Sequence, residues 1–186
     1  MEKIHGGTTE SRGWALIASL ETFRGCSIKF ASKNSGFNGM SVSMRSETRK
    51  IELKTVDHSD NWFAINGLQG IKKLFFDKDY WLYFSLLPES TVITVKALPF
   101  LERQVSYKTG KNLLEQLESW INLTEGITKN FGLQFIPRIN FKVITPIRKM
   151  LKQIIDDPQN DQWKVMATSV WKLGENGYWE KLHGEE

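Results

Sequence analysis

The chain from residue 36 to residue 56 reads Gly36-Phe37-Asn38-Gly39-Met40-Ser41-Val42-Ser43-Met44-Arg45-Ser46-Glu47-Thr48-Arg49-Lys50-Ile51-Glu52-Leu53-Lys54-Thr55-Val56. Two strand-like runs flank a polar turn at 45–49, which predicts a β-hairpin. In the second run Ile51 and Leu53 alternate with Glu52 and Lys54, so a strand would turn the apolar pair to one face and the charged pair to the other. An acid and a lysine within an apolar strand are costly unless they are paired or functional. This charged pair is therefore the strongest functional signal in the sequence.

The composition limits the class of protein before other motifs are considered. The chain has 186 residues, of which 40% are hydrophobic and 25% charged, as expected of one soluble domain with or without a small appendage. Its formal charge of +4 permits a nucleic-acid partner without requiring one. Cys26 is the one cysteine, which excludes a disulfide within the chain and makes a cytoplasmic setting the expectation. No apolar run reaches the roughly 18 residues of a membrane-spanning helix, so we expect no membrane contact.

The segment 9–23, upstream of the hairpin, has the periodicity of a helix. Its apolar stripe is expected to hold Leu16, Leu20 and Phe23, widened by Trp14, Ile17 and Ala18. Its two glutamates share a second line of side chains, so either could face the hairpin, although solvated charges at the helix ends are the alternative. That line, with offsets of 0, 4, 7 and 11 residues, consists of Glu10, Trp14, Ile17 and Glu21.

Strands and helices alternate downstream of the hairpin, which predicts a mixed α/β domain with a central sheet flanked by helices. The run 81–87 is nearly all apolar and aromatic, as a central strand is. The composition of 174–177, Gly-Glu-Asn-Gly, predicts a hairpin turn near the end of the chain. The other expected elements are strands at 26–30, 62–65, 91–97, 163–173 and 178–182 and helices at 68–76, 111–123 and 146–155.

The charged pair of the hairpin suits hydrolysis of a phosphodiester. Such a reaction needs a divalent metal at the phosphate and an activated water. Magnesium prefers oxygen ligands from one or two carboxylates, and a lysine beside them can orient the water and stabilise developing negative charge. Glu52 and Lys54 supply a carboxylate and the lysine, and the remaining part would be an acid on the neighbouring strand. The sequence has neither zinc-ligand spacing nor a Gly-x-x-x-x-Gly-Lys loop, so we expect no small-molecule cofactor.

Residues 9–100 resemble the PD-(D/E)XK nuclease superfamily, which includes restriction endonucleases, resolvases and defence nucleases. The matching features are the helix, a strand, Gly36-Phe37-Asn38 in the place of the acidic dipeptide and Glu52-Leu53-Lys54 in the place of the (D/E)XK motif. The resemblance implies a restriction endonuclease-like core over 1–103. Residues 104–186 would be an α+β extension for DNA recognition or dimerisation, or would continue one domain.

The resemblance also implies roles for individual residues. Glu52 and residue 38 would hold magnesium, or manganese, and Lys54 would be the catalytic lysine. Glu10 or Glu21 would be an additional acid from the helix, with Glu10 the expected metal ligand.

Asn38 departs from the family pattern, in which this position is an aspartate. A neutral amide binds magnesium far less well than a carboxylate does. Asn38 is therefore an introduced inactivating substitution, or a natural feature of a degenerate nuclease that only binds, or a sign that another acid serves. In the third case the acid would be Asp57, Asp60 or Glu47.

The expected function is that of a magnesium-dependent DNA endonuclease from a restriction or anti-phage defence system. A homodimer is expected because cutting both strands of duplex DNA takes two sites. The alternatives are a non-catalytic nucleic-acid-binding or assembly subunit, an RNA-directed nuclease, and an ordinary solvated strand face with no site. Basic residues can contact phosphates without reading sequence, and those expected to do so are Lys72, Lys73, Arg148, Lys149 and Lys152.

Overall fold

A computed structural model describes residues 8–31, 37–57, 64–66, 77–103, 115, 119, 122, 140–142 and 147–184. Its helices are α1 (Thr8–Phe23), α3 (Ala97–Leu101), α5 (Ile147–Asp156) and α6 (Asp161–Val165). Its strands are β1 (Ser27–Phe30), β2 (Gly39–Val42), β3 (Thr48–Val56), β4 (Ala64–Asn66), β5 (Tyr80–Leu86), β6 (Thr91–Lys96), β7 (Asn140–Lys142), β8 (Ser169–Leu173) and β9 (Trp179–His183).

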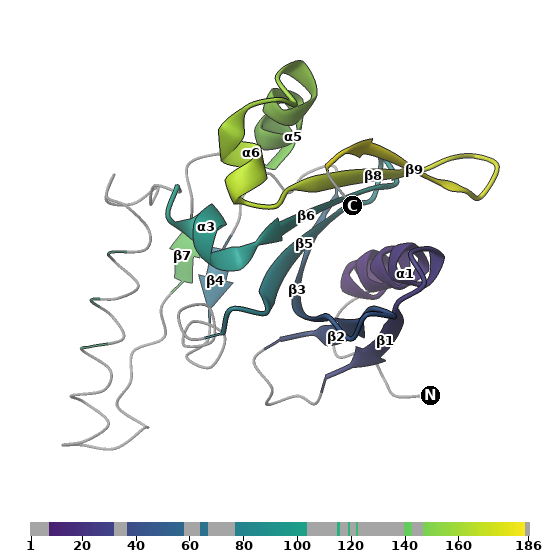
Figure 1. The fold of residues 1–186 in the computed structure, drawn as a ribbon, viewed down its shortest axis with the longest axis horizontal. Helices are drawn as coiled ribbons and strands as arrows, with labels where there is room; N and C mark the ends of the chain where they lie inside the picture. Colours follow the sequence, from purple (N-terminus) through teal and green to yellow (C-terminus); the bar gives the residue numbers. More distant parts are fainter. Residues whose placement is uncertain are drawn as a thin grey trace.

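Seven strands form one mixed, curled sheet in the order β1-β2-β3-β5-β6-β8-β9, and β4 pairs with β7 apart from it (Figure 1). Neighbours in the large sheet are antiparallel except β3 and β5, which are parallel. A parallel pair needs a crossover connection, and here the chain between the two strands supplies it. The fold is thus α/β with a mixed central sheet, as the sequence predicted.

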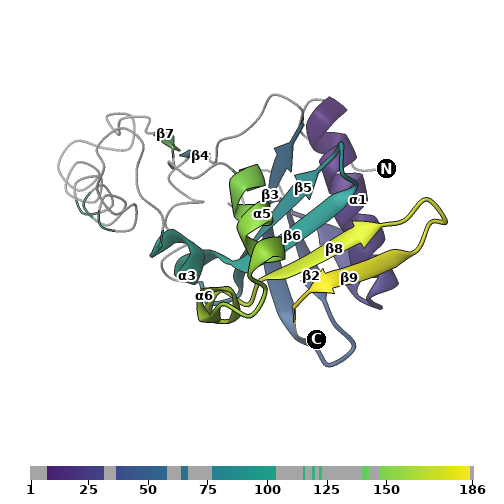
Figure 2. The ribbon, with the colours of Figure 1, turned by 90° about the horizontal axis from the view of Figure 1, so that it is seen from above.

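Helices cover both faces of the large sheet. α1 lies on one face, and α3, α5 and α6 lie on the other (Figures 1 and 2). Alternate residues of β5 enter the two resulting cores: Leu82 and Phe84 pack with Met150 of α5, whereas Tyr83 packs with Ile17 of α1. Because both faces are covered, β5 is buried along its whole length, which explains its nearly continuous apolar sequence.

α1 is present as predicted, but the expected apolar stripe is wrong at Phe23, whose side chain is 50% exposed. Leu20 of the stripe is fully buried, and Trp14 and Ile17, which were expected to widen it, are buried with it in the core under α1. Glu21 is buried as well. α1 ends in a turn that Gly25 completes at a φ of +76°, a conformation glycine adopts without strain.

The hairpin is formed by β2 and β3 and confirms the prediction, with its turn at 43–47 instead of 45–49. The turn falls earlier because Thr48 and Arg49 already pair with β2. Ile51 and Leu53 are buried under α1, as the alternation predicted. Glu52 and Lys54 lie on the opposite face.

The final third of the chain contributes to the same sheet as the first. β8 pairs with β6, and β9 pairs with β8 after the predicted turn at 174–177. The strand predicted over 163–173 is wrong in its first half, because Asn160 caps α6 by accepting a hydrogen bond from Gln162 N at 3.0 Å, and Trp163 belongs to that helix. The helix predicted at 68–76 lies outside the described residues, as does most of the helix predicted at 111–123.

Among the described helices, none combines the length and apolar character that crossing a bilayer requires. The division of the chain into a core over 1–103 and an extension over 104–186 stays a prediction.

Candidate functional site

Glu52 and Lys54 stand side by side on the face of β3 that turns away from α1. Lys54 Nζ lies 3.2 Å from Glu52 Oε1, and the two side chains are 22% and 27% exposed. Their partners in register on β5 are the buried Leu82 and Phe84. The pair is therefore half-buried in the wall of the core, where its mutual attraction is less screened than at an open surface.

Asn38 connects this strand to the first turn of α1. Its backbone N–H donates to Ile51 O at 2.8 Å, and its side-chain Oδ1 accepts from Leu53 N at 2.7 Å. On its other side, Asn38 Nδ2 donates to Glu10 Oε1 at 3.4 Å. The structure thus brings Asn38 and Glu10 together at the backbone of Leu53, the residue between Glu52 and Lys54.

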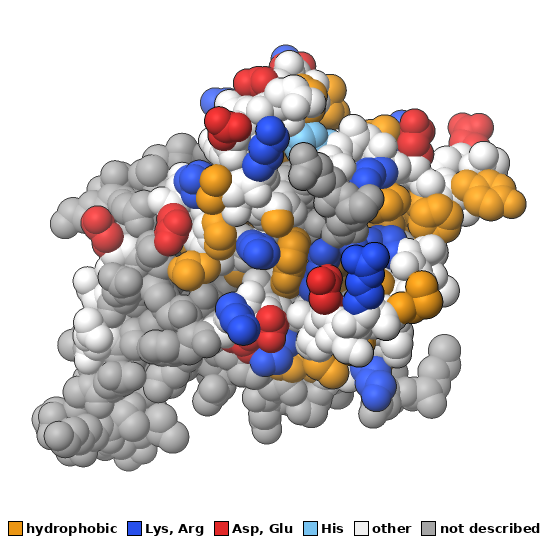
Figure 3. Space-filling view, viewed as in Figure 1, with side chains coloured by type: hydrophobic (Ala, Val, Ile, Leu, Met, Phe, Trp, Pro, Cys, Tyr) orange, Lys and Arg blue, Asp and Glu red, His pale blue; other side chains and the backbone are white. Residues whose placement is uncertain are grey.

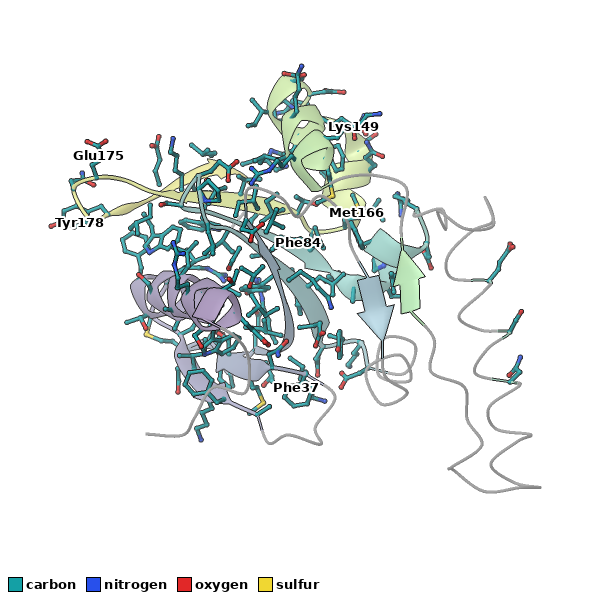
Figure 4. The ribbon with its side chains drawn as sticks, turned by 180° about the vertical axis from the view of Figure 1, so that it is seen from behind. Phe37, Phe84, Lys149, Met166, Glu175 and Tyr178 are labelled. Atoms are coloured by element: carbon teal, nitrogen blue, oxygen red, sulfur yellow. The ribbon has the colours of Figure 1, made fainter. Side chains whose placement is uncertain are left out.

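Two neighbours of Asn38 hold it in this position. Phe37 packs against the hydrophobic cluster on the face opposite α1 (Figure 4). On the other face Gly39 lies against Trp14, so closely that a Cβ at residue 39 would stand 2.1 Å from the indole ring. Glu10 lies one turn before Trp14 on the same line of α1, and this spacing directs it to the start of β2.

Tyr80, which the sequence did not single out, also belongs to the site. Its hydroxyl lies 3.4 Å from Glu52 Oε2, and the residue is 2% exposed. Burial, and then the charge of Glu52, raise the pKa of the Tyr80 phenol far above its usual range, so the hydroxyl stays a neutral donor. The parallel pairing of β3 with β5 creates this contact, and no spacing in the sequence reveals it.

Glu21, the other glutamate considered on the helix, lies elsewhere. Eleven residues separate it from Glu10, or about 16 Å along a helix. It is fully buried and accepts hydrogen bonds from Arg24 Nη1 at 2.7 Å, from Tyr83 Oη at 3.1 Å and from Ser41 Oγ. Glu21 therefore faces the hairpin as the sequence allowed, but at the opposite end from Asn38.

The other acids considered for the position of Asn38 are not beside Glu52 in the described structure. Glu47 is exposed in the turn at the far end of the hairpin. Asp57 follows the end of β3, where its backbone carbonyl accepts a hydrogen bond from Arg148 Nη2 at 2.7 Å. Asp60 lies outside the described residues.

The predicted phosphate-contacting residues differ in their surroundings. Arg148 is paired with Glu89 and bonded to the end of β3, so it ties α5 to the sheet. Lys149 and Lys152 are exposed on α5, and Lys149 extends away from the sheet in Figure 4. Lys72 and Lys73 lie outside the described residues.

The site contains few acidic residues that could bind a metal ion. Within the part of the chain that the structure describes, no three His, Cys, Asp or Glu residues gather as a metal site. Glu10 and Glu52 offer carboxylate oxygens, and Asn38 offers an amide between the first helix turn and β3. Comparison of the chain with protein-family models, with curated proteins and with solved structures found no match.

Proposed function

We propose that this chain is a magnesium-dependent DNA endonuclease of the PD-(D/E)XK type, acting on duplex DNA as a homodimer, whose activity Asn38 suppresses. One observation carries the proposal. The side chain of Asn38 bonds both to Glu10 and to the backbone of Leu53, at the position where an acid would join Glu52 and Lys54. A restriction or anti-phage defence role follows from the same resemblance.

The order of the elements supports the same proposal. The chain runs from a helix through a strand into the hairpin that carries Glu52 and Lys54, and then by a crossover to a strand parallel with β3. The helix, the strand and the hairpin are the features on which the resemblance to the superfamily rests, and the parallel pairing of β3 with β5 is an addition from the structure. The pair lies on the half-buried face of a central strand, whereas an ordinary solvated pair would lie on an open edge.

The residues present fit magnesium only in part. Glu10 and Glu52 supply hard oxygen ligands, but Asn38 turns its Nδ2 toward Glu10, so a hydrogen bond lies where a cation would join the two side chains. With aspartate at position 38, the three carboxylates would hold the metal. Magnesium, when bound, supplies Lewis-acid stabilisation of the phosphate.

Lys54 is the side chain of this protein that would act directly on the reacting groups. Its ammonium group lies 3.2 Å from Glu52, so the carboxylate fixes its direction within the half-buried face. From there it can orient the attacking water and stabilise the negative charge that develops at the phosphate. Tyr80 donates to the second oxygen of Glu52 and so limits the rotation of that carboxylate.

Plasmid cleavage tests the proposal. Supercoiled plasmid is incubated with magnesium and four proteins: the chain itself, Asn38→Asp, Asn38→Asp/Lys54→Ala and Asn38→Asp/Lys29→Ala. The last is a matched control, because Lys29 is an exposed lysine of β1. Cleavage by Asn38→Asp and by the Lys29 control is expected, with a rate at least about 10²-fold lower when Lys54 is absent. If none of the four proteins cuts duplex, single-stranded or branched DNA, the catalytic proposal is wrong.

A second function, a non-catalytic nucleic-acid-binding or assembly subunit, is favoured by one specific observation. Both polar groups of the Asn38 side chain are bonded within the protein, so the site is complete without a metal. Under this alternative the unaltered chain binds DNA, and Asn38→Asp binds it equally well without cutting. A gel-shift titration run beside the cleavage assay separates the two functions.

A further inference from the structure

A second concave site lies at the other end of α1. Its cavity of about 730 Å³ is bounded by the end of α1, the turn 43–47, the starts of β3 and β5, the end of β6, the segment 163–169 and the end of β9. Figure 2 shows the turn between β2 and β3 near the end of β9. Glu10 and Arg24 are 14 residues apart, which at about 1.5 Å of helical rise per residue puts the cavity about 20 Å from Glu10. The cavity is therefore separate from the site at Asn38.

The net positive charge of the chain is concentrated around this cavity. Among the residues that the structure describes, five cations and one acid line it, so this lining carries a formal charge of +4, which equals the charge of the whole chain. All the other residues together then sum to zero. Lys and Arg side chains gather near the centre of the face drawn in Figure 3. The charged residues of the lining are Arg24, Arg45, Arg49, Lys96, Lys164 and Glu47.

A buried network fixes two of these arginines at the cavity. The guanidinium of Arg49 lies 3.9 Å from the centre of the Trp81 ring, and its Nη1 donates to Tyr83 Oη at 3.0 Å. Tyr83 Oη in turn donates to Glu21, which also accepts from Arg24. Guanidinium groups held in place before binding lose little freedom when an anion arrives. Glu21, buried near the end of α1, thus holds Arg24 directly and Arg49 through Tyr83.

A polar group without a partner also lies in the cavity wall. Thr168 is 4% exposed, and its Oγ1 makes no hydrogen bond among the described residues. A buried hydroxyl without a partner is costly, and a ligand oxygen in the cavity would satisfy it.

Volume and chemistry limit the ligand. A cavity of this size suits an organic ligand and exceeds what one inorganic phosphate fills. Arginine forks and lysine ammonium groups suit phosphate oxygens. Trp81 and Trp163 in the lining are only 7% and 4% exposed, so neither offers an open ring face on which a base could stack. If the ligand is a nucleotide, its affinity would come from contacts to its phosphate groups and not from stacking of its base.

We infer that this cavity binds a ligand carrying two or more phosphate groups, supplied by a nucleoside polyphosphate or by the backbone of a short nucleic-acid strand. The inference does not rest on the proposed nuclease activity, because it uses none of the residues around Asn38.

Calorimetric titration of the full chain tests the inference, with EDTA present so that cleavage plays no part. The probes are ATP, GTP, AMP, inorganic phosphate and a 5′-phosphorylated trinucleotide. We expect ATP or the trinucleotide to bind at least about tenfold more tightly than AMP and phosphate. ATP and GTP should agree within about threefold, because the base is not recognised. Binding of ATP alone identifies a nucleotide as the ligand, and binding of the trinucleotide alone identifies a nucleic-acid strand.

Charge-reversal variants locate the binding. Arg45→Glu/Lys164→Glu changes two exposed residues of the lining and should weaken binding at least about tenfold. Lys29→Glu/Lys172→Glu makes the same change in net charge at exposed positions outside the lining and should leave binding nearly unaltered. Thr168→Val should weaken binding about tenfold without lowering the melting temperature, since it removes a hydroxyl that the free protein leaves unbonded.

Three results would overturn the inference. Equal weakening by the two charge-reversal pairs would mean diffuse attraction to a basic protein. Equal affinity for inorganic phosphate and ATP would mean that the cavity does not bind several phosphate groups of one ligand at once. Absence of binding to all five probes would exclude the site, whatever the outcome of the cleavage assay.

Discussion

The substitution Asn38→Asp is expected to make the stability of this protein depend on a divalent metal. In the unaltered chain Asn38 Nδ2 donates to Glu10 Oε1 at 3.4 Å. An aspartate would replace that hydrogen bond with two carboxylates at a similar separation. Their repulsion is about 1 kcal/mol in water and about 5 kcal/mol at an effective dielectric constant of about 20. Because both residues are partly exposed, we expect a loss between these limits, to which the lost hydrogen bond adds about 1 kcal/mol.

Chemical denaturation at pH 8, in EDTA and in magnesium or manganese, measures this loss. Asn38→Asp should be less stable than the unaltered chain in EDTA and should recover about 1.4 kcal/mol when the free metal is ten times its Kd. Glu10→Gln/Asn38→Asp is the control, because it removes the repulsion and should lose little stability in EDTA. Equal stability of Asn38→Asp and the unaltered chain, with no response to metal, would refute the reasoning.

Further predictions concern the support of the site and the surface around it. Gly39→Ala should lower the free energy of unfolding by about 1–3 kcal/mol in urea denaturation, because its Cβ would overlap Trp14. Tyr80→Phe, made in Asn38→Asp, should weaken manganese binding about tenfold or more in calorimetry while the protein stays folded; unchanged affinity would remove Tyr80 from the site. Arg148→Ala should cost about 1–2 kcal/mol through its lost ion pair and hydrogen bond. Lys149→Ala should leave stability within about 0.5 kcal/mol of the parent and, if it contacts a phosphate, reduce the salt slope of DNA binding by about 0.9.

The hairpin and its charged pair could be predicted because the strand alternation is a local property. Ile51 and Leu53 must enter the core, so Glu52 and Lys54 had to share the other face. The line from Glu10 to Glu21 also followed from helix geometry, but the sequence left open whether its two glutamates face the hairpin or the solvent. In the structure they contact Asn38 and Ser41 of the hairpin. Phe23 was assigned to the core because hydrophobicity alone does not decide which residues at the margin of an apolar stripe a sheet will cover.

The rest depended on contacts between distant segments. Tyr80 meets Glu52 through the register of two parallel strands that 23 residues separate. The lining of the basic cavity comes from seven segments that are spread over residues 24 to 184, so no window of sequence contains its charge pattern. Trp163 was read as part of a strand because a short apolar run fits either period, and the cap at Asn160 decides for a helix.

Manganese binding to the folded protein tests most directly whether position 38 is the missing acid of a metal site. Electron paramagnetic resonance of free manganese, titrated against equal concentrations of protein, gives the number of sites and their affinity. Asn38→Asp is expected to bind one ion, at least about tenfold more tightly than both the unaltered chain and Asn38→Asp/Glu52→Gln. Equal binding by the three proteins, or no binding by any of them, would contradict the assignment of Glu10, Glu52 and residue 38 to one metal site.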